Sequence, residues 1–329
     1  MTRAATDGDA GLAARLRQHL GPRHPVAAVA LVSPGGVVLA SVGAGLDADF
    51  EIGSISKGLT GLLYRQACEL GEIGAESTLG DLLPLQQGPA GPLRLAAVSR
   101  HESGLPRLPR SAQPLRRALR FLRTGENPYG EDLTELLAQA RTVRLSSTRR
   151  RYSNFGFELL GHAVARGAGL DYATLLRERL TEPLGLTSMY APATRAELRP
   201  GALPGTSRSG RPRPPWTGEA VAPAGGIRSS ITDLARLTQA LLDGSAPGIS
   251  ALDPVAPIAR RGVNIGAAWI TLSVRGRSIT WHDGATGGFR SWLGLDRAAG
   301  TGVVVLTATS RSVDRHGFAL LTELTDAHS

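Results

Sequence analysis

Cysteine and long apolar runs are scarce in this 329-residue chain, and each absence excludes a class of protein. Cys68 is the one cysteine, which excludes a disulfide scaffold and any metal site built from several cysteines. No stretch approaches about 18 uninterrupted apolar residues, so the sequence predicts neither a membrane span nor a membrane partner. Residues 1–22 lack the apolar run of a signal peptide, and we therefore expect a cytoplasmic protein.

Lysine is the other scarce residue. Lysine and arginine together number 37, of which one is Lys57, and the net charge is +9. The arginine clusters at 107–123, 149–151 and 208–213 lack the lysines, stacking aromatics and motifs that nucleic-acid modules combine, so we expect no nucleic-acid partner. With 42% hydrophobic and 20% charged residues, the composition is that of a folded globular protein.

Periodicity predicts strands at both ends of the chain and helices between them. Residues 26–32 and 37–42 form two alternating apolar runs around a Pro-Gly turn, which indicates a hairpin. Helices are expected near 12–20, at 54–70, 231–242 and 313–325, and further strands at 267–274, 277–281, 291–296 and 302–307. We therefore expect one catalytic domain, 1–329, with an α/β lobe from about 1–80 plus 215–329 and a mainly helical lobe from about 81–214.

The first candidate site is the segment Gly53-Ser54-Ile55-Ser56-Lys57. If Ser54 opens a helix, Lys57 lies one turn later on the same face, within reach of the serine hydroxyl. Serine is a weak nucleophile until a neighbour accepts its proton, which lysine can do when burial lowers its pKa and arginine cannot. Taken alone, the pattern also fits a serine that caps a helix.

The second and third candidates are Tyr152-Ser153-Asn154 and the glycine-rich segment from Trp281 to Phe289. A tyrosine beside a lysine can share its proton, and an asparagine offers a donor and an acceptor to an amide-like substrate. Exposed N–H groups of the glycine-rich segment, with that of Ser54, would form an oxyanion hole. The alternatives are a helix N-cap for the former and an ordinary hairpin turn for the latter.

Together these segments resemble the serine β-lactamase and penicillin-binding-protein superfamily, in which S-x-x-K is a known motif. The class C β-lactamase-like branch is most similar, because it has Tyr-x-Asn and often His-x-Gly as second and third motifs. Flanking segments are also similar to those of this branch: His101-Glu102-Ser103-Gly104-Leu105-Pro106, Glu182-Pro183-Leu184-Gly185-Leu186 and Pro223-Ala224-Gly225-Gly226-Ile227.

The resemblance implies an α/β (α+β) fold, with an antiparallel sheet formed from both chain ends, flanking helices and an inserted helical lobe. It implies Ser54 as nucleophile, Lys57 as base, and Tyr152 as the group that passes the proton to the leaving group and activates water. Asn154 would hold the acyl side chain, and His282 would take the place of the third motif's lysine. The N–H groups of Ser54 and Ala285 would form the oxyanion hole, without metal or organic cofactor.

Two departures from the family pattern bear on the substrate. Residues 145–151 lack the Pro-Gly that usually precedes Tyr-Ser-Asn and carry Arg149, Arg150 and Arg151 instead. Asp283 stands where the family binds a substrate carboxylate, which it would repel unless Arg290 neutralises it. We also expect Asp283, Gly284 and Arg290 to contact the substrate.

These departures favour an esterase or amidase acting on a small metabolite through an acyl-Ser54 intermediate. An acyltransferase that passes the acyl group to an amine or alcohol is an alternative, as is a β-lactamase or DD-peptidase-like activity. A non-catalytic ligand-binding homologue is a lesser alternative, because motifs alone do not establish activity.

Overall fold

The structure is a computed structural model that describes residues 5–109, 113–129, 132–146, 150–258, 262–274 and 276–328. Within these residues the main sheet has nine antiparallel strands in the order β1-β3-β2-β13-β12-β11-β10-β9-β8. They are β1 (Thr6–Gly8), β2 (Ala27–Ser33), β3 (Gly36–Val42), β8 (Ala256–Pro257), β9 (Val263–Ile265), β10 (Ile270–Val274), β11 (Arg277–Ala285), β12 (Arg290–Asp296) and β13 (Thr301–Thr307). Two-stranded sheets pair β4 (Phe50–Glu51) with β7 (Arg228–Ser229) and β5 (Gly205–Thr206) with β6 (Pro212–Arg213).

The two ends of the chain meet in the middle of the main sheet. β2 pairs with β13 with Val29 opposite Val305, and both strands are buried almost throughout. Alternate residues face opposite sides, so Val29 packs in one core and Ala28 and Ala30 in the other. The expected antiparallel sheet from both chain ends is confirmed.

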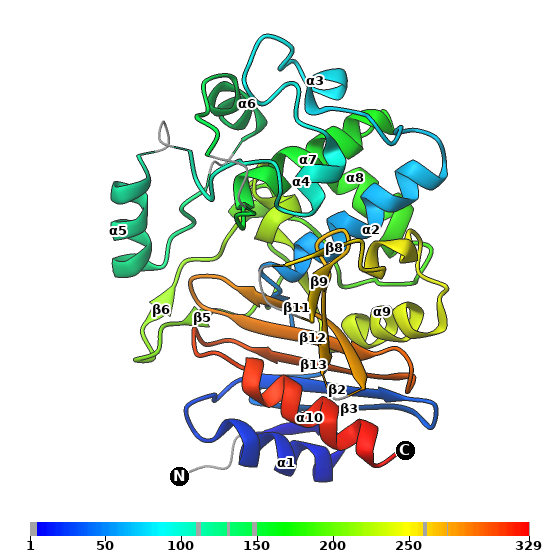
Figure 1. Cartoon of the computed structure of the whole chain (residues 1–329). Helices are drawn as coiled ribbons and strands as arrows, with labels where there is room; N and C mark the ends of the chain where they lie inside the picture. The colour runs from blue at the N-terminus through cyan, green and yellow to red at the C-terminus, as the bar shows by residue number, and fades with distance from the viewer. Residues whose placement is uncertain are drawn as a thin grey trace.

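Helices cover both faces of this sheet, as Figure 1 shows. α1 (Ala10–Leu20) and α10 (Asp314–Asp326) lie on one face, and α2 (Ile55–Glu69) and α9 (Ile231–Asp243) lie on the other. The apolar side chains Leu12, Leu16 and Leu20 of α1 are buried in the first core, as their helical spacing predicts. The four helices therefore cover the sheet, and the adjoining ends of β11 and β12 contact the chain at Ile52.

The remaining helices gather on the α2 side of the sheet. They are α3 (Leu79–Leu82), α4 (Leu95–Ser99), α5 (Pro114–Thr124), α6 (Leu133–Arg141), α7 (Asn154–Gly167) and α8 (Tyr172–Leu176), with short helical turns at Arg177–Thr181, Arg195–Glu197, Ala222–Gly226 and Ile249–Leu252. α7 is the most buried of these and packs on α2, whereas α5 stands apart at one side of the molecule. The predicted lobe boundaries near residues 81 and 214 stay a prediction. In the described part of the chain no helix is long and apolar enough to cross a membrane.

Two strands differ from the ranges that the sequence predicts. β10 begins at Ile270 rather than at 267, because Ala268 has a positive φ of 70° and ends the extended conformation. β11 continues past Trp281 to Ala285, where the alternating pattern is hidden by His282, Asp283 and glycine. The third candidate segment therefore begins inside a strand rather than in a hairpin turn.

Candidate active site

Ser54 lies in a sharp turn between β4 and α2. Gly53 precedes it with φ 53°, a conformation that glycine adopts without steric cost, and the chain then enters the helix. Ser54 occupies the N-cap position, but its side chain makes no capping hydrogen bond. The alternative of a simple helix cap is therefore wrong, and the hydroxyl is available to other partners.

Buried ion pairs hold β4 just before this turn. The Arg228 guanidinium of β7 donates to Asp49 Oδ1 at 2.8 Å and to Glu51 Oε1 at 3.1 Å, and none of its side chain is exposed. Burial raises the pKa of the Glu51 carboxyl, and Arg228 opposes this effect. The network ties the two short strands together directly beneath Ser54.

Lys57 lies one turn after Ser54, and its Nζ lies 3.0 Å from Ser54 Oγ. The side chain is fully buried, and Nζ also donates to the carbonyl of Ala224. Burial, opposed by Glu158 and Asp283 and aided by the Arg107 charge, lowers the pKa of Lys57 to about 7. A substantial fraction of neutral amine is therefore present at neutral pH beside the serine hydroxyl.

Tyr152 completes a cluster with these two side chains. Its hydroxyl bonds Ser54, and Lys57 Nζ lies 5.0 Å from its ring centroid. The loss of water around the hydroxyl raises the pKa of Tyr152, and the bond to Ser54 opposes this, although the residue as a whole is 38% exposed. The structure thus brings the three predicted residues together at one point.

The His101 ring packs against the Tyr152 ring. The two ring centroids are 4.6 Å apart, and His101 Nδ1 accepts the N–H of Ser153 at 3.1 Å. Ser153 in turn caps α7, since its hydroxyl accepts from the N–H of Gly156 at 2.8 Å. The alternative that Tyr-Ser-Asn is a helix N-cap is thus correct for Ser153, and the cap places Tyr152 and Asn154 on either side of it.

Asn154 begins α7 and lines the cleft beside Ser54. Its Nδ2 donates to the hydroxyl of Tyr129, whereas its buried Oδ1 has no hydrogen-bond partner within the described residues. Buried polar atoms are rarely left without a partner, so this oxygen is suited to accept a donor from a bound ligand.

The backbone N–H of Ala285 lies close to the turn that holds Ser54. A Cβ added to Gly53 would lie 2.5 Å from the amide nitrogen of Ala285, which shows how closely the turn approaches β11. Thr286 donates its N–H across the hairpin at 3.2 Å, and since N–H directions alternate along a strand, that of Ala285 points away from β12. β10 stops pairing with β11 at Trp281, so this side of Ala285 is open to the Ser54 turn.

The other predicted residues of β11 have different surroundings. His282 is buried, its Nδ1 bonds the Asp283 carbonyl at 2.7 Å, and burial and the Lys57 charge lower the pKa of its ring to about 4. Gly284 is also buried and is not among the described residues that line the cleft, in contrast to the prediction. A Cβ there would lie 2.0 Å from the Ile52 carbonyl oxygen, so glycine permits the close approach of β11 to the turn.

Asp283 and Arg290 both line the cleft. Burial raises the pKa of Asp283, and Lys57 and Arg290 oppose that shift. Arg290 Nη1 donates to the carbonyls of Thr286 and Phe289 at 2.9 and 2.8 Å, so its hydrogen bonds hold the hairpin rather than the Asp283 carboxylate. Of the predicted arginine cluster before Tyr152, Arg149 lies outside the described residues, and Arg150 is paired with Glu102.

The cleft has a volume of about 640 Å³, and much of its wall comes from residues that the sequence did not single out. Trp216 and Tyr129 pack with their ring centroids 5.7 Å apart, and Arg107 lies above the Tyr152 ring. Glu158 is buried on α7 near Lys57, and burial raises the pKa of its carboxyl to about 8. No sequence motif marks these residues, because they come from separate loops and helices that meet only in the fold.

No group of three or more histidine, cysteine or acidic side chains with the geometry of a metal site occurs among the residues described. His101 and His162 are instead engaged with the backbone, at Ser153 and Glu219. Both histidines therefore have structural partners.

Known proteins share both sequence and fold with this chain. The β-lactamase family model matches residues 12–324. The human "Putative beta-lactamase-like 1" is 30% identical over 281 residues, which are 80% of this chain and 54% of that protein. The chain spans about half the length of the curated relatives it matches.

Solved structures give the fold independently. D-alanine carboxypeptidase AmpC from Burkholderia cenocepacia aligns with a TM-score of 0.79 at 21% identity, over 96% of this chain and 99% of that one. A class C β-lactamase from Rhodobacter sphaeroides aligns with a TM-score of 0.75 at 21% identity, over 96% and 97%. With the family model covering nearly the whole sequence, the chain belongs to the β-lactamase family of serine hydrolases.

Proposed function

We propose that the chain cleaves an ester or amide of a small metabolite through an acyl-Ser54 intermediate. The observation that carries this proposal is the 3.0 Å approach of Lys57 Nζ to Ser54 Oγ, at a lysine whose pKa burial lowers to about 7. A neutral amine at this distance can accept the hydroxyl proton, which is the activation that a serine nucleophile requires.

In the acylation step, Ser54 Oγ attacks the substrate carbonyl carbon while its proton passes to the neutral Lys57 amine. The N–H groups of Ser54 and Ala285 stabilise the oxyanion that forms. When the carbon–leaving-group bond breaks, Tyr152 donates its proton to the departing oxygen or nitrogen and regains one from the Lys57 ammonium. The acyl group then remains on Ser54 as an ester.

In the deacylation step, water attacks the ester carbonyl carbon and passes its proton to Tyr152, which passes its own proton to the neutral Lys57 amine. The ester bond breaks, Ser54 Oγ recovers a proton, and the acid product leaves. Acyl transfer to an amine or alcohol would follow the same acylation step and differ in how well water is excluded from the ester.

The charges in the cleft bear on the substrate. Asp283 lines the cleft, and the family resemblance puts it where a β-lactam or D-alanyl peptide would place its carboxylate. Arg290 is committed to backbone carbonyls. An ionised Asp283 would repel such a group. We therefore place esters and amides without a carboxylate next to the scissile bond ahead of β-lactams and D-alanyl peptides as substrates.

Intact-mass analysis after incubation with a fluorophosphonate tests the proposal. We expect one adduct on the parent protein and none on Ser54→Ala. Absence of an adduct on the folded parent after long exposure would refute serine acylation and favour a non-catalytic ligand-binding homologue. If esters are turned over, an added acceptor amine should leave free acid as the product, whereas an amide product would show acyl transfer.

A further inference from the structure

Helix α5 carries an apolar surface that the proposed chemistry does not use. Its sequence places leucines at 115, 119 and 122, an i, i+4, i+7 spacing that puts them on one face. Their exposed fractions are 87%, 58% and 71%, and none of the helix is buried. We call Leu115, Leu119 and Leu122 the leucine stripe.

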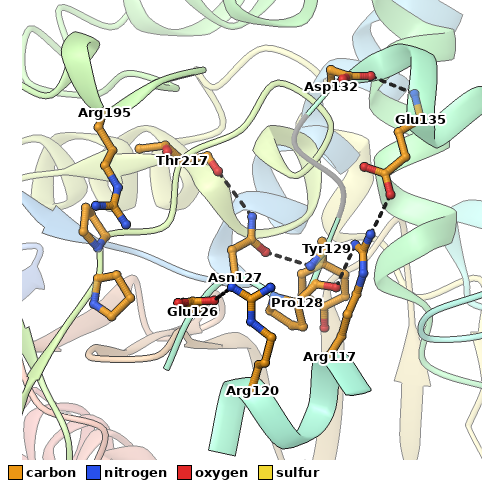
Figure 2. Close-up of a pocket in the computed structure, with 12 residues that line it drawn as sticks. Arg117, Arg120, Glu126, Asn127, Pro128, Tyr129, Asp132, Glu135, Arg195 and Thr217 are labelled. Atoms are coloured by element: carbon orange, nitrogen blue, oxygen red, sulfur yellow. Dashed lines mark hydrogen bonds and ion pairs between the residues drawn. The ribbon is translucent and has the colours of Figure 1, made fainter. Parts of the chain in front are cut away.

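The opposite face of α5 is held by polar contacts, so the stripe is not exposed merely because the helix is loose. Arg117 pairs with Glu135 at 2.6 Å and Arg120 pairs with Glu126. Figure 2 shows these two arginines reaching from α5 into a pocket that Glu126 and Glu135 also line. The arginine face of α5 is therefore held by ion pairs to Glu135 and Glu126, whereas the leucine face is exposed.

The C-terminal end of α5 is anchored to two other segments of the chain. Trp216 Nε1 donates to the Gly125 carbonyl at 3.0 Å, and Arg213 donates to the Arg123 carbonyl at 2.7 Å. A Cβ on Gly287, in the hairpin after β11, would lie 2.0 Å from the Gly125 carbonyl oxygen. These hydrogen bonds satisfy carbonyls at the end of the helix, and the close approach of Gly287 sets α5 against the hairpin that follows Ala285.

The stripe continues the wall of the active-site cleft. Pro114, Ala118, Phe121 and Leu122 of α5 line the same cavity as Ser54. We call Trp216 and Tyr129, which pack together in the cleft, the aromatic wall. The Phe121 ring lies 6.1 Å from that of Trp216 and joins α5 to this wall. Leu122 belongs both to the cavity and to the stripe, so apolar surface runs from beside Ser54 outwards along the helix.

Asn154 indicates which part of the substrate meets this surface. Its Nδ2 bonds Tyr129, a member of the aromatic wall, and its partnerless Oδ1 faces the acyl group under the proposed mechanism. The apolar wall therefore adjoins the acyl side of the scissile bond. Water would be displaced from it by a chain of methylenes, each of which contributes about 0.8 kcal/mol when buried.

We propose that the aromatic wall and the leucine stripe form an extended site for a linear apolar acyl chain, so that the substrates are esters or amides of medium- to long-chain acids. This inference rests on the proposed function for the position of the acyl group. The acyl chain of the substrate would then cover the leucine stripe, because this surface is continuous with the cavity that holds Ser54.

The test measures kcat/KM for p-nitrophenyl esters from acetyl to decanoyl. On the parent we expect kcat/KM to rise about two- to fourfold per methylene up to about octanoyl. Acetates of lengthening alcohols should show a much smaller rise. A flat or falling acyl-length profile would overturn the inference.

The variant removes the stripe by Leu115→Gln, Leu119→Gln and Leu122→Gln, since glutamine favours helix about as well as leucine. We expect at least a tenfold fall in the octanoyl-to-acetyl ratio of kcat/KM relative to the parent. Arg116→Gln on the same helix and Leu70→Gln, an exposed leucine elsewhere, are matched controls that should keep the parent profile. Equal losses for acetyl and octanoyl esters in the triple variant would contradict the inference.

A binding measurement separates this inference from the proposed function. Ser54→Ala is titrated by calorimetry with sodium decanoate and sodium butyrate, and we expect decanoate to bind at least tenfold more tightly, with the preference lost in the triple variant. Decanoate preference without any fluorophosphonate adduct would refute the proposed function and leave the apolar site standing. A fluorophosphonate adduct on Ser54 without a preference for decanoate over butyrate would refute the apolar site and leave the proposed function standing. Uptake of the protein by anionic lipid vesicles through the stripe, with a flat ester profile, would assign the stripe to a lipid surface instead.

Discussion

The substitution Lys57→Arg tests the central step of the proposed mechanism. The pKa of Lys57 falls from 10.5 to about 7 on burial, which corresponds to about 5 kcal/mol against the charged form. At pH 7 about half of the amine is neutral, compared with roughly one part in 3,000 for an ordinary lysine. Arginine stays charged throughout this range, so the variant should label with fluorophosphonate at least about 10³-fold more slowly.

The pH dependence carries the same prediction in the parent. The labelling rate should rise with pH as Lys57 loses its proton and reach half of its maximum near pH 7. The rate of Lys57→Arg should stay low up to pH 10. Labelling of Lys57→Arg within tenfold of the parent, or a parent midpoint near pH 10, would refute the assignment of Lys57 as the base.

Lys57→Met is the matched control for size, because it keeps a long side chain without a charge. It should also fail to label, and it should be more stable than the parent below pH 7. Between about pH 7 and 10.5 the unfolded parent binds more protons than the folded one, so the free energy of unfolding of the parent rises with pH. The stability advantage of the methionine variant should therefore shrink towards pH 10 in denaturant titrations, and a constant gap would contradict the buried, shifted lysine.

Three further predictions concern the surrounding structure. Tyr152→Phe should lower kcat/KM by about 10²- to 10⁴-fold, since it removes proton transfer to the leaving group, and an unchanged value would assign that role elsewhere. Gly53→Ala should slow labelling by about 10²-fold or more by pushing the turn away from β11, whereas Gly71→Ala, with φ 74° and no heavy atom within 4 Å of the added Cβ, should match the parent. Arg228→Leu should lower the free energy of unfolding by about 3–5 kcal/mol, because it leaves the Asp49 and Glu51 carboxylates buried without a counter-charge. A loss below about 1 kcal/mol in urea titrations would contradict this.

Much of the fold follows from local sequence patterns. The apolar, β-branched runs of β2 and β3 around a Pro-Gly turn indicate a hairpin, and the helical spacing of leucines in α1 indicates a helix with one buried face. The extension of β11 to Ala285 was missed, since histidine, aspartate and glycine break the alternation. Their place in the strand depends on pairing with β12, which is a contact distant in sequence.

The site divides in the same way. Ser54, Lys57 and Tyr152 are found from the sequence, because two lie one helical turn apart and the third belongs to a short motif beside a helix start. The low pKa of Lys57 depends on burial by the Ala222–Gly226 turn and α7, neither of which its own segment specifies.

The sequence by itself determined the reactive groups and the chain order in which they occur, because their chemistry depends on residue type and short spacing. The tertiary structure alone decided that Trp216, Tyr129 and α5 form an apolar wall beside Ser54. Those residues are separated by up to about a hundred positions, and nothing in their local patterns requires them to meet. Long-range packing therefore set the apolar surface of the cleft beside Ser54, whereas local sequence set the reactive groups that lie in it.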